Sequence, residues 1–315
     1  MQTILGANGQ IAEVLAQELH AKYTSEIRLV SRNPKKVNPS DELHAANLLD
    51  AQATVESVDG SSIAYLTVGL PIDSDMWEEL FPVMMANVIA ACKQHACKLV
   101  FFDNTYMYPQ TREPQTEETP FAPFGRKGRV RAQIAEMLLA EMAKGAIDAV
   151  ICRAPEFYGP GKTQSLTNSM LFNRIRAHRQ LVVPISAETK RTLIWTPDAS
   201  RAMARIGNSP EAYRQTWHLP CDDDRLTYAG LIALASELFE RELDYRVLGR
   251  WFFRLGGLFN QRLREVRELL PRYGQDNIFV SDKFKRHFPD FEVMPYAEGV
   301  ACIRDEQRAE SEGSE

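Results

Sequence analysis

Long hydrophobic runs are absent from this sequence of 315 residues. No apolar stretch reaches the roughly 20 residues that a membrane-spanning helix needs. The first residues also lack the charged and apolar regions of a signal peptide. Cysteine is scarce, and an odd number of five thiols in a chain of this length indicates reduced cysteines rather than a disulfide framework. We therefore expect a cytoplasmic protein that does not enter a membrane.

An excess of positive charge is also absent. The formal net charge is −5 and there is no long tract of lysine or arginine, which argues against broad nucleic-acid binding because that requires a positive surface. The spacing of Cys92 and Cys97 does not match a zinc site, and His218 and His287 are isolated. The sequence therefore predicts a small-molecule partner, no nucleic acid and no metal.

The first half of the chain alternates short apolar segments with longer helical patterns, which is typical of βαβ units and a parallel sheet. The clearest helical pattern is the apolar stripe from Trp77 to Cys92, and a second runs from Val130 to Met142. The expected strands are Thr3–Leu5, Ile27–Ser31, Ser62–Val68, Lys98–Asp103 and Ala146–Cys152.

These patterns predict an α/β fold, a doubly wound parallel Rossmann sheet with a smaller C-terminal domain that covers the substrate. We expect the Rossmann domain over residues 1–153, completed by about residues 190–215, and the substrate-binding domain mainly over residues 154–315. The tail 304–315 is acidic and lacks an apolar period, so we expect it to be solvated and disordered.

A glycine motif follows the first expected strand and opens a helix, which is the context of a dinucleotide-binding turn. Gly6 permits the tight turn, and Gly9 removes the Cβ that would block a pyrophosphate. Free N–H groups at the helix start then face the anion. The alternative is a plain strand-to-helix turn. The expected cofactor-binding residues here are Gly6, Asn8, Gly9, Gln10 and Ile11.

The end of the second strand indicates which dinucleotide is bound. Sites for NAD place a carboxylate there, whereas this chain has Ser31 and Arg32, which suit a 2′-phosphate. We therefore expect NADP, with NAD possible if Arg32 is only a solvated loop residue. Asn47 is placed either to bond the adenine edge or to cap a helix.

The residues now resemble the short-chain dehydrogenase/reductase superfamily, in particular its NAD(P)-dependent epimerase/dehydratase branch. The resemblance covers most of the chain and implies that Val68, Gly69 and Pro155 line the cofactor site. It rests on the glycine motif and on four further segments: Ala64 to Gly69, Phe101 to Tyr108, Arg153 to Gly161 and Trp195 to Asp198.

The resemblance also implies a serine or threonine after the fifth strand and a Tyr-x-x-x-Lys pair on the next helix. The first position falls on Asn104, with Thr105 beside it. The helix that should carry the pair runs from Phe124 to Gln133 and contains no tyrosine. The usual acid/base is therefore missing.

Three hypotheses follow. The chain is an atypical oxidoreductase or isomerase for a small carbonyl or sugar-like substrate, with Lys127, Arg131, Tyr106 or Tyr108 as proton donor. Alternatively, it binds NADP(H) without turnover, as a redox-sensing regulatory protein. The third is ordinary nucleotide-sugar epimerase or dehydratase chemistry by another route. Related proteins often form homodimers through two helices of this fold.

Two charged segments have more than one interpretation. The basic residues from Arg126 to Arg131 stand at a helix start, where they need an anion nearby: a cofactor phosphate, an acidic substrate or the glutamates of the preceding loop, Glu113, Glu117 and Glu118. Farther on, the stripe from Trp251 to Phe259 is flanked by arginines. It matches a membrane-surface helix, but the negative net charge favours a helix of the substrate-binding domain.

Overall fold

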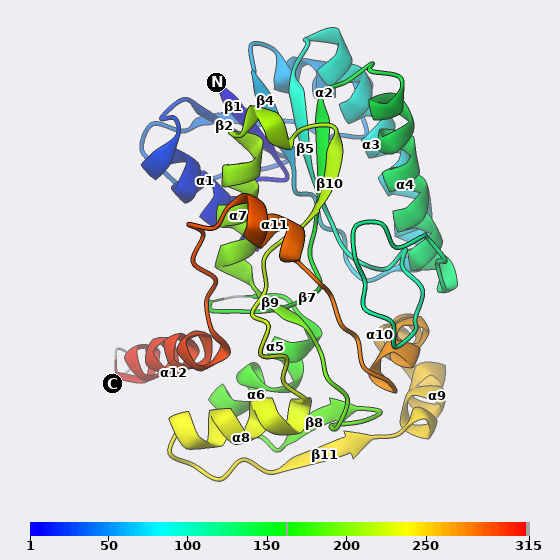
Figure 1. Cartoon of the computed structure of the whole chain (residues 1–315), viewed down its shortest axis with the longest axis vertical. Coiled ribbons are helices and arrows are strands. Elements are labelled where there is room, and N and C mark those ends of the chain that lie inside the picture. The colour runs from blue at the N-terminus through cyan, green and yellow to red at the C-terminus, as the bar shows by residue number, and fades with distance from the viewer. Residues whose placement is uncertain (162, 313–315) are drawn as a thin grey trace. The chain divides into compact units, whose positions relative to one another are not determined.

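The computed structural model describes residues 1–161 and 163–312 (Figure 1). By its internal contacts the chain divides into two compact units. The first comprises residues 1–108, 120–154 and 199–219, and the second residues 109–119, 155–198 and 220–315. The two are described separately below.

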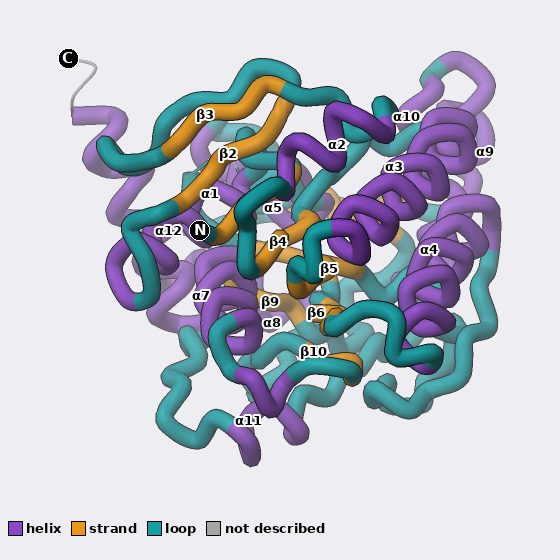
Figure 2. The backbone as a smooth tube through the Cα atoms, turned by 90° about the horizontal axis from the view of Figure 1, so that it is seen from above, coloured by secondary structure: helices purple, strands orange, loops and turns teal. Residues whose placement is uncertain are grey.

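The first unit is built on a seven-stranded, fully parallel sheet (Figure 2). Its strand order, β10-β6-β5-β4-β1-β2-β3, reverses direction between β1 and β4, and ligands of such sheets bind at this switch point. The predicted doubly wound Rossmann sheet is confirmed. The strands are β1 (Gln2–Leu5), β2 (Ile27–Ser31), β3 (Glu42–Ala45), β4 (Ile63–Leu66), β5 (Lys98–Asp103), β6 (Ala149–Arg153) and β10 (Gln215–His218).

Helices cover both faces of this sheet, with α1 and α7 on one side and α2, α3 and α4 on the other (Figures 1 and 2). The apolar stripes predicted for α3 and α4 are buried against the sheet, because each recurs every three to four residues. The helices are α1 (Gln10–Lys22), α2 (Ala51–Val58), α3 (Ser74–Gln94), α4 (Gly125–Ala143), α7 (Thr196–Gly207) and the 3₁₀ turn η1 (Pro210–Ala212).

The second unit packs short strands and helices around a core of its own. Its two small parallel sheets pair β7 (Glu156–Tyr158) with β9 (Leu193–Trp195), and β8 (Leu181–Pro184) with β11 (Tyr245–Leu248). Its helices are α5 (Leu166–Met170), α6 (Phe172–Arg176), α8 (Tyr228–Leu238), α9 (Arg250–Phe259), α10 (Gln261–Val266), η2 (Arg267–Tyr273), α11 (Asp282–His287) and α12 (Tyr296–Glu312).

The tail differs from the expectation of disorder over 304–315. Helix α12 continues to Glu312, and residues 313–315 lie outside the described part of the chain. Ile303 is buried, and the Gln307 side chain donates a hydrogen bond to the Phe172 carbonyl at 3.2 Å. The sequence does not indicate this helix, because only every fourth residue of its last turns faces the core. No helix in the described ranges has both the length and the apolar content of a membrane span.

Replacing Ile303 by alanine tests whether α12 contributes to the core of the second unit. We expect the free energy of unfolding to fall by about 2 to 5 kcal/mol, since a buried isoleucine leaves a cavity. Denaturant unfolding measures the change. Glu310→Ala, which breaks an exposed ion pair with Arg176, is the control and should cost less than about 1 kcal/mol. Equal stability of both variants would show that α12 is not part of the core.

Candidate functional site

The loop between β1 and α1 brings the backbone of a glycine turn to the switch point of the sheet. Gly6 has a φ of +99°, and a Cβ on it would lie 2.9 Å from the Cα of Val68, so no other residue fits there. Gly9 has an ordinary φ of −83°, and a Cβ on it would meet only the Gly6 carbonyl at 3.5 Å. The protein's own packing therefore does not require a glycine at position 9.

The start of α1 is suited to an anion. Gly9 is its N-cap and offers no side chain to the first-turn N–H groups. These groups and the helix dipole favour a negative charge at this end. Gln10 and Ile11 open the helix, and the buried Ile11 accepts a hydrogen bond from Ser200 at 2.9 Å, which anchors the helix to α7. A diphosphate fits the residues present.

The end of β2 lies beside the glycine loop. Asn8 donates through its side-chain amide to the Asn33 carbonyl at 2.7 Å, which joins the loop after β1 to the loop after β2. Val68 and Gly69 follow β4, the strand on the other side of β1. The structure thus brings together the predicted cofactor residues of three adjacent strands. Pro155 belongs to the second unit.

Arg32 is an exposed cation that makes no hydrogen bond or ion pair with any described residue. The carboxylates that follow it are already used: Asp41 accepts from the backbone N–H of Val37 and Asn38, and Glu42 pairs with Arg28 at 2.7 Å. Ser31 ends β2, and its hydroxyl oxygen accepts from the Asn33 N–H at 3.3 Å. The edge of the site that would face a dinucleotide ribose is therefore positive.

Asn47 does not cap a helix. The N-cap of α2 is Asp50, which accepts from the Ala53 N–H at 3.0 Å. Asn47 instead accepts from the Leu49 N–H at 3.2 Å within a local turn after β3, where it is exposed.

A buried charge network occupies the carboxyl end of β5. The carboxylate of Asp103 accepts from Arg131 of α4 at 2.5 Å and lies 3.4 Å from the Nε of Arg153, at the end of β6. All three side chains are almost completely buried. Two guanidinium groups share one carboxylate, so the network holds a net positive charge inside the protein.

Tyr108 extends this network to a third strand. Arg153 donates to its hydroxyl oxygen at 2.8 Å, and the same oxygen lies 2.7 Å from Nε2 of His218, the last residue of β10. Tyr108 and His218 are both fully buried, and the ring of Phe121 packs over the Arg153 guanidinium. His218, an isolated residue in the sequence, is thus part of the cluster, which only the pairing of β10 with β6 reveals.

The other residues predicted after β5 form a compact turn. Asn104 accepts the Tyr106 N–H on its side-chain oxygen at 2.9 Å, and the Thr105 carbonyl accepts the Tyr108 N–H at 3.2 Å. Thr105 is buried. The Tyr106 ring stacks on Trp77 of α3, with centroids 6.1 Å apart.

The start of α4 is closed to a further side chain. Lys127 is fully buried, and its amine donates to the Ser74 hydroxyl of α3 at 2.8 Å. A Cβ on Gly128 would lie 2.8 Å from the Tyr106 carbonyl oxygen, too close for any side chain. Phe124 is the N-cap of α4, so both Lys127 and Gly128 lie in its first turn.

The anions that balance the basic start of α4 come from α3. Arg126 bonds Glu78 at 2.8 Å and Asp75 at 2.6 Å. This bond from Arg126 lowers the pKa of the Glu78 carboxyl. Arg131 has Asp103 as its partner. For these two arginines the protein supplies the carboxylates from elements other than the preceding loop.

The second unit contains a polar cluster that no sequence pattern indicates. Glu156 of β7 accepts from Arg191 at 3.0 Å, from Thr167 at 2.7 Å, and from the hydroxyls of Tyr228 and Tyr273 at 3.0 and 3.1 Å. Burial raises the pKa of Tyr228, which keeps its hydroxyl protonated as a donor. Four donors surround the Glu156 carboxylate, whereas Nε of the buried Arg191 has no hydrogen-bond partner among the described residues.

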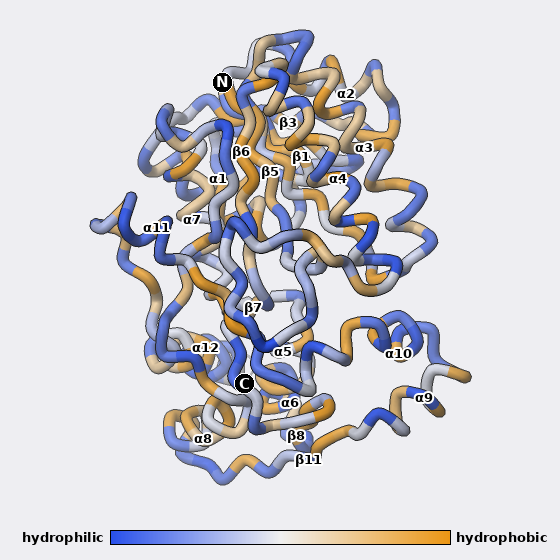
Figure 3. Tube along the Cα trace, turned by 45° about the vertical axis from the view of Figure 1, so that its right-hand side comes forward, coloured by the Kyte–Doolittle hydropathy of each residue, from blue (hydrophilic) through white to orange (hydrophobic). Residues whose placement is uncertain are grey.

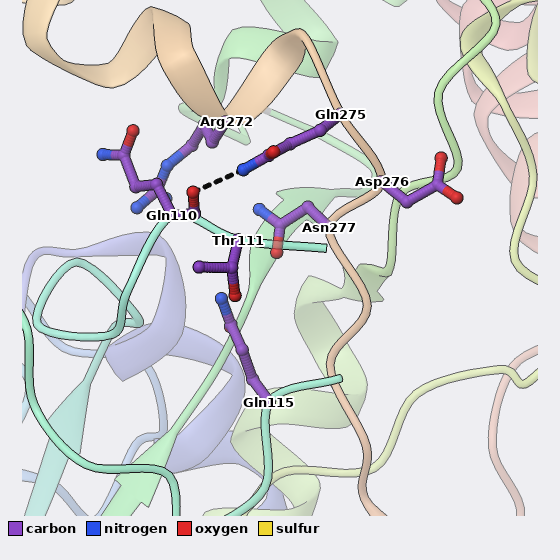
Figure 4. Close-up of a pocket in the computed structure, with 7 residues that line it drawn as sticks. All are labelled: Gln110, Thr111, Gln115, Arg272, Gln275, Asp276 and Asn277. Carbon is purple, nitrogen blue, oxygen red and sulfur yellow. Dashed lines mark hydrogen bonds between the residues drawn. The ribbon is translucent and has the colours of Figure 1, made fainter. Parts of the chain in front are cut away.

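A polar depression in the same unit is shown in Figure 4. Gln275 donates across it to the Gln110 carbonyl at 2.5 Å, and the side chains leave no room for a ligand. It is lined by Gln110, Thr111, Gln115, Arg272, Gln275, Asp276 and Asn277. Within residues 1–161 and 163–312, no three His, Cys, Asp or Glu side chains gather as a metal site.

Residues 3–218 match the model of the NAD dependent epimerase/dehydratase family. This match covers the glycine loop and the cluster at the end of β5, and it supports a nicotinamide dinucleotide as the cofactor. No curated protein sequence matches the chain.

Several solved structures share the fold. The UDP-glucuronic acid 4-epimerase of Bacillus cereus, in complex with UDP-glucuronic acid and NAD, is 12% identical with a TM-score of 0.80, and 98% of this chain and 99% of that chain are covered. The UDP-glucose 4-epimerase of Thermus thermophilus, in complex with NAD, is 14% identical with a TM-score of 0.77 at the same coverage. At such identities the likeness establishes the fold alone.

Replacing Asp103 by asparagine tests the buried network. We expect the free energy of unfolding to fall by about 3 to 5 kcal/mol, because Arg131 and Arg153 lose their shared carboxylate while remaining buried. The control is Asp148→Asn, which breaks an exposed pair with Arg214 at 2.7 Å and should cost less than about 1 kcal/mol. A similar small loss in both variants, measured by denaturant unfolding, would contradict the structural role of Asp103.

Proposed function

Because the chain belongs to the NAD dependent epimerase/dehydratase family, we propose that it binds NADP(H) at the glycine loop and acts as a regulatory protein that senses this dinucleotide. The observation that carries the proposal is the state of the residues after β5. The hydroxyl of Tyr108 and the amine of Lys127 are buried in contacts of the protein itself. The glycine loop and the start of α1 are therefore open to the dinucleotide. The two groups that could transfer a proton are bonded to other residues of the protein.

Binding of NADP(H) rather than NAD(H) is supported by charge. Arg32 presents a planar fork of donors with no carboxylate beside it, and Ser31 adds a hydroxyl donor. The 2′-phosphate of the dinucleotide would be held by these two residues. Its diphosphate would lie at Gly9 and the start of α1, and its adenine beside Asn47. Val68 and Gly69, which follow β4, would line the remainder. When bound, the dinucleotide supplies a redox-active nicotinamide.

The absence of turnover is supported by the start of α4. Phe124 has no hydroxyl, and the backbone around Gly128 excludes any side chain. A lysine in that place would need the turn at Tyr106 to move. The segment from Phe124 to Gln133 contains no tyrosine, so the Tyr-x-x-x-Lys pair that the resemblance implies is absent from it.

A second function, an oxidoreductase or isomerase for a small carbonyl or sugar-like substrate, is favoured by one contact. The Arg153 guanidinium donates to the Tyr108 hydroxyl oxygen at 2.8 Å, so a cation stands at the oxygen that would give up the proton. His218 on the other side would accept or return the proton. In this function Tyr108 is the acid/base, and Asn104, Thr105 and Tyr106 shape the turn that presents it.

The dinucleotide preference is tested with Arg32→Glu. We expect NADPH to bind about 10 to 100 times more weakly, because a charge-assisted hydrogen bond to phosphate is lost, while NADH binding changes little. Titration calorimetry measures both ligands. Arg112→Glu, at an exposed position of the second unit, is the charge-matched control. A wild-type protein that binds NADH more tightly than NADPH would overturn the assignment.

The binding site itself is tested with Gly9→Val. The fold has space for a Cβ at Gly9, so we expect unfolding to be little changed and dinucleotide binding to weaken by at least about tenfold. The two measurements are thermal unfolding without ligand and the thermal shift produced by NADPH. Unchanged NADPH affinity in a folded variant would place the dinucleotide elsewhere.

The two functions are separated by following NADPH in the presence of a panel of carbonyl compounds. The regulatory function predicts stoichiometric binding without oxidation, and equal binding by Tyr108→Phe. The enzyme predicts oxidation that falls by about 100-fold or more in Tyr108→Phe. Tyr106→Phe is the matched control, since the Tyr106 ring stacks on Trp77 and phenylalanine keeps that ring.

A further inference from the structure

Helix α9 presents its apolar stripe to solvent. The exposed fractions are 68% for Trp251, 57% for Leu255, 69% for Leu258 and 93% for Phe259. The first three stand at positions i, i+4 and i+7, so they form one face of the helix. The sequence favours a helix of the substrate-binding domain here, and α9 lies in the second unit with this face exposed.

The opposite face of α9 fixes the helix in this orientation. Gly257 is buried, and a Cβ on it would lie 3.4 Å from the Arg264 Cα of the neighbouring helix α10. A Cβ on Gly256 would come within 2.6 Å of Leu263. Phe253 is buried on the same side. Because α9 packs closely on α10 through these residues, its apolar face on the other side stays exposed. Figure 3 shows the two helices side by side, with hydrophobic and hydrophilic residues following one another along α9.

Positive charge borders the exposed stripe. Residues 246–272 contain seven arginines and two glutamates, in a chain whose net charge is −5. Arg250, Arg254 and Arg267 line a cavity of about 190 Å³ together with Leu270 and Pro271. None of these three arginines has a carboxylate partner among the described residues, and all three are exposed.

We propose that α9 is a docking element for an anionic phospholipid bilayer. Trp251, Leu255 and Leu258 enter the boundary between head groups and acyl chains, and the arginines of the cavity hold the lipid phosphates. The arrangement has the two components that binding to a bilayer surface requires. These are an apolar face that can be buried in the bilayer and electrostatic attraction to anionic lipid. The helix lies on the bilayer, since its ten residues are too short to span it.

A protein partner or a second copy would cover the apolar face but leave the charge unexplained. This chain is acidic overall, yet two copies of α9 facing one another would bring arginines together. An anionic bilayer satisfies both the arginines and the apolar face with one surface. The proposal is independent of what the glycine loop binds.

The experiment is vesicle sedimentation of the full chain with phosphatidylcholine alone and with added phosphatidylserine. We expect binding to the anionic vesicles, at least about tenfold weaker binding to the neutral ones, and loss of binding at high salt. Leu255→Ser with Leu258→Ser should weaken binding by about tenfold or more, and so should Arg250→Gln with Arg254→Gln. The matched control is Val83→Ser, which changes a 43% exposed residue of α3 and should bind as the wild type.

Trp251 gives an independent readout. The other three tryptophans, Trp77, Trp195 and Trp217, are buried, so a change in emission on adding vesicles reports Trp251. We expect a blue shift and quenching by brominated acyl chains, both absent in Trp251→Phe.

Three results would overturn the proposal. One is the lack of binding to anionic vesicles at low salt. Another is binding that survives the paired α9 substitutions. The third is a dimer in the absence of lipid that Leu255→Ser with Leu258→Ser dissociates, because a second copy then covers the face. A thermal shift with inorganic phosphate but no vesicle binding counts with the first, since the cavity then serves a free anion.

Discussion

The carboxylate of Asp103 is the contact on which the first unit depends. It lies at the end of β5 between Arg131 of α4 and Arg153 of β6, and Arg153 carries the connection on to Tyr108 and His218 of β10. One buried anion thus joins three neighbouring strands and a helix at the edge of the sheet where ligands of this fold bind. Such a cluster is costly to bury, and its hydrogen bonds make the arrangement specific.

The Asp103 network also divides the sheet edge into two parts. One part can bind a ligand, and in the other the polar side chains are bonded to the protein itself. The glycine turn, the open start of α1 and the unpaired Arg32 lie around the ends of β1, β2 and β4, where the backbone leaves space for a ligand. At the end of β5, by contrast, the polar side chains are used by the protein. The same sheet edge is therefore prepared for an anionic dinucleotide on one side and filled by internal salt bridges on the other. This division is the physical reason why a protein that senses the dinucleotide is favoured over an enzyme that turns it over.

The second unit balances its charges in a different way. Glu156 is surrounded by four donors in its interior, whereas Arg250, Arg254 and Arg267 stand around a cavity with no carboxylate partner among the described residues. The exposed apolar face of α9 beside these arginines is unfavourable in water, because burying apolar surface lowers the free energy. The close packing of α9 on α10 through its paired glycines explains how the fold keeps that face exposed.

The sequence by itself determined the parallel sheet, the stripes of α3 and α4, the glycine turn and the cationic end of β2, because each depends on local periodicity or on a residue at a fixed distance from a strand. It did not indicate that the tail continues as a helix, because only some residues of its last turns face the core. Only the tertiary structure decided that Tyr108, Arg153 and His218 meet, that Lys127 is buried, and that Gly128 has no room for a side chain. Those facts arise from strand order and helix packing between residues far apart in the chain, and no local pattern encodes them.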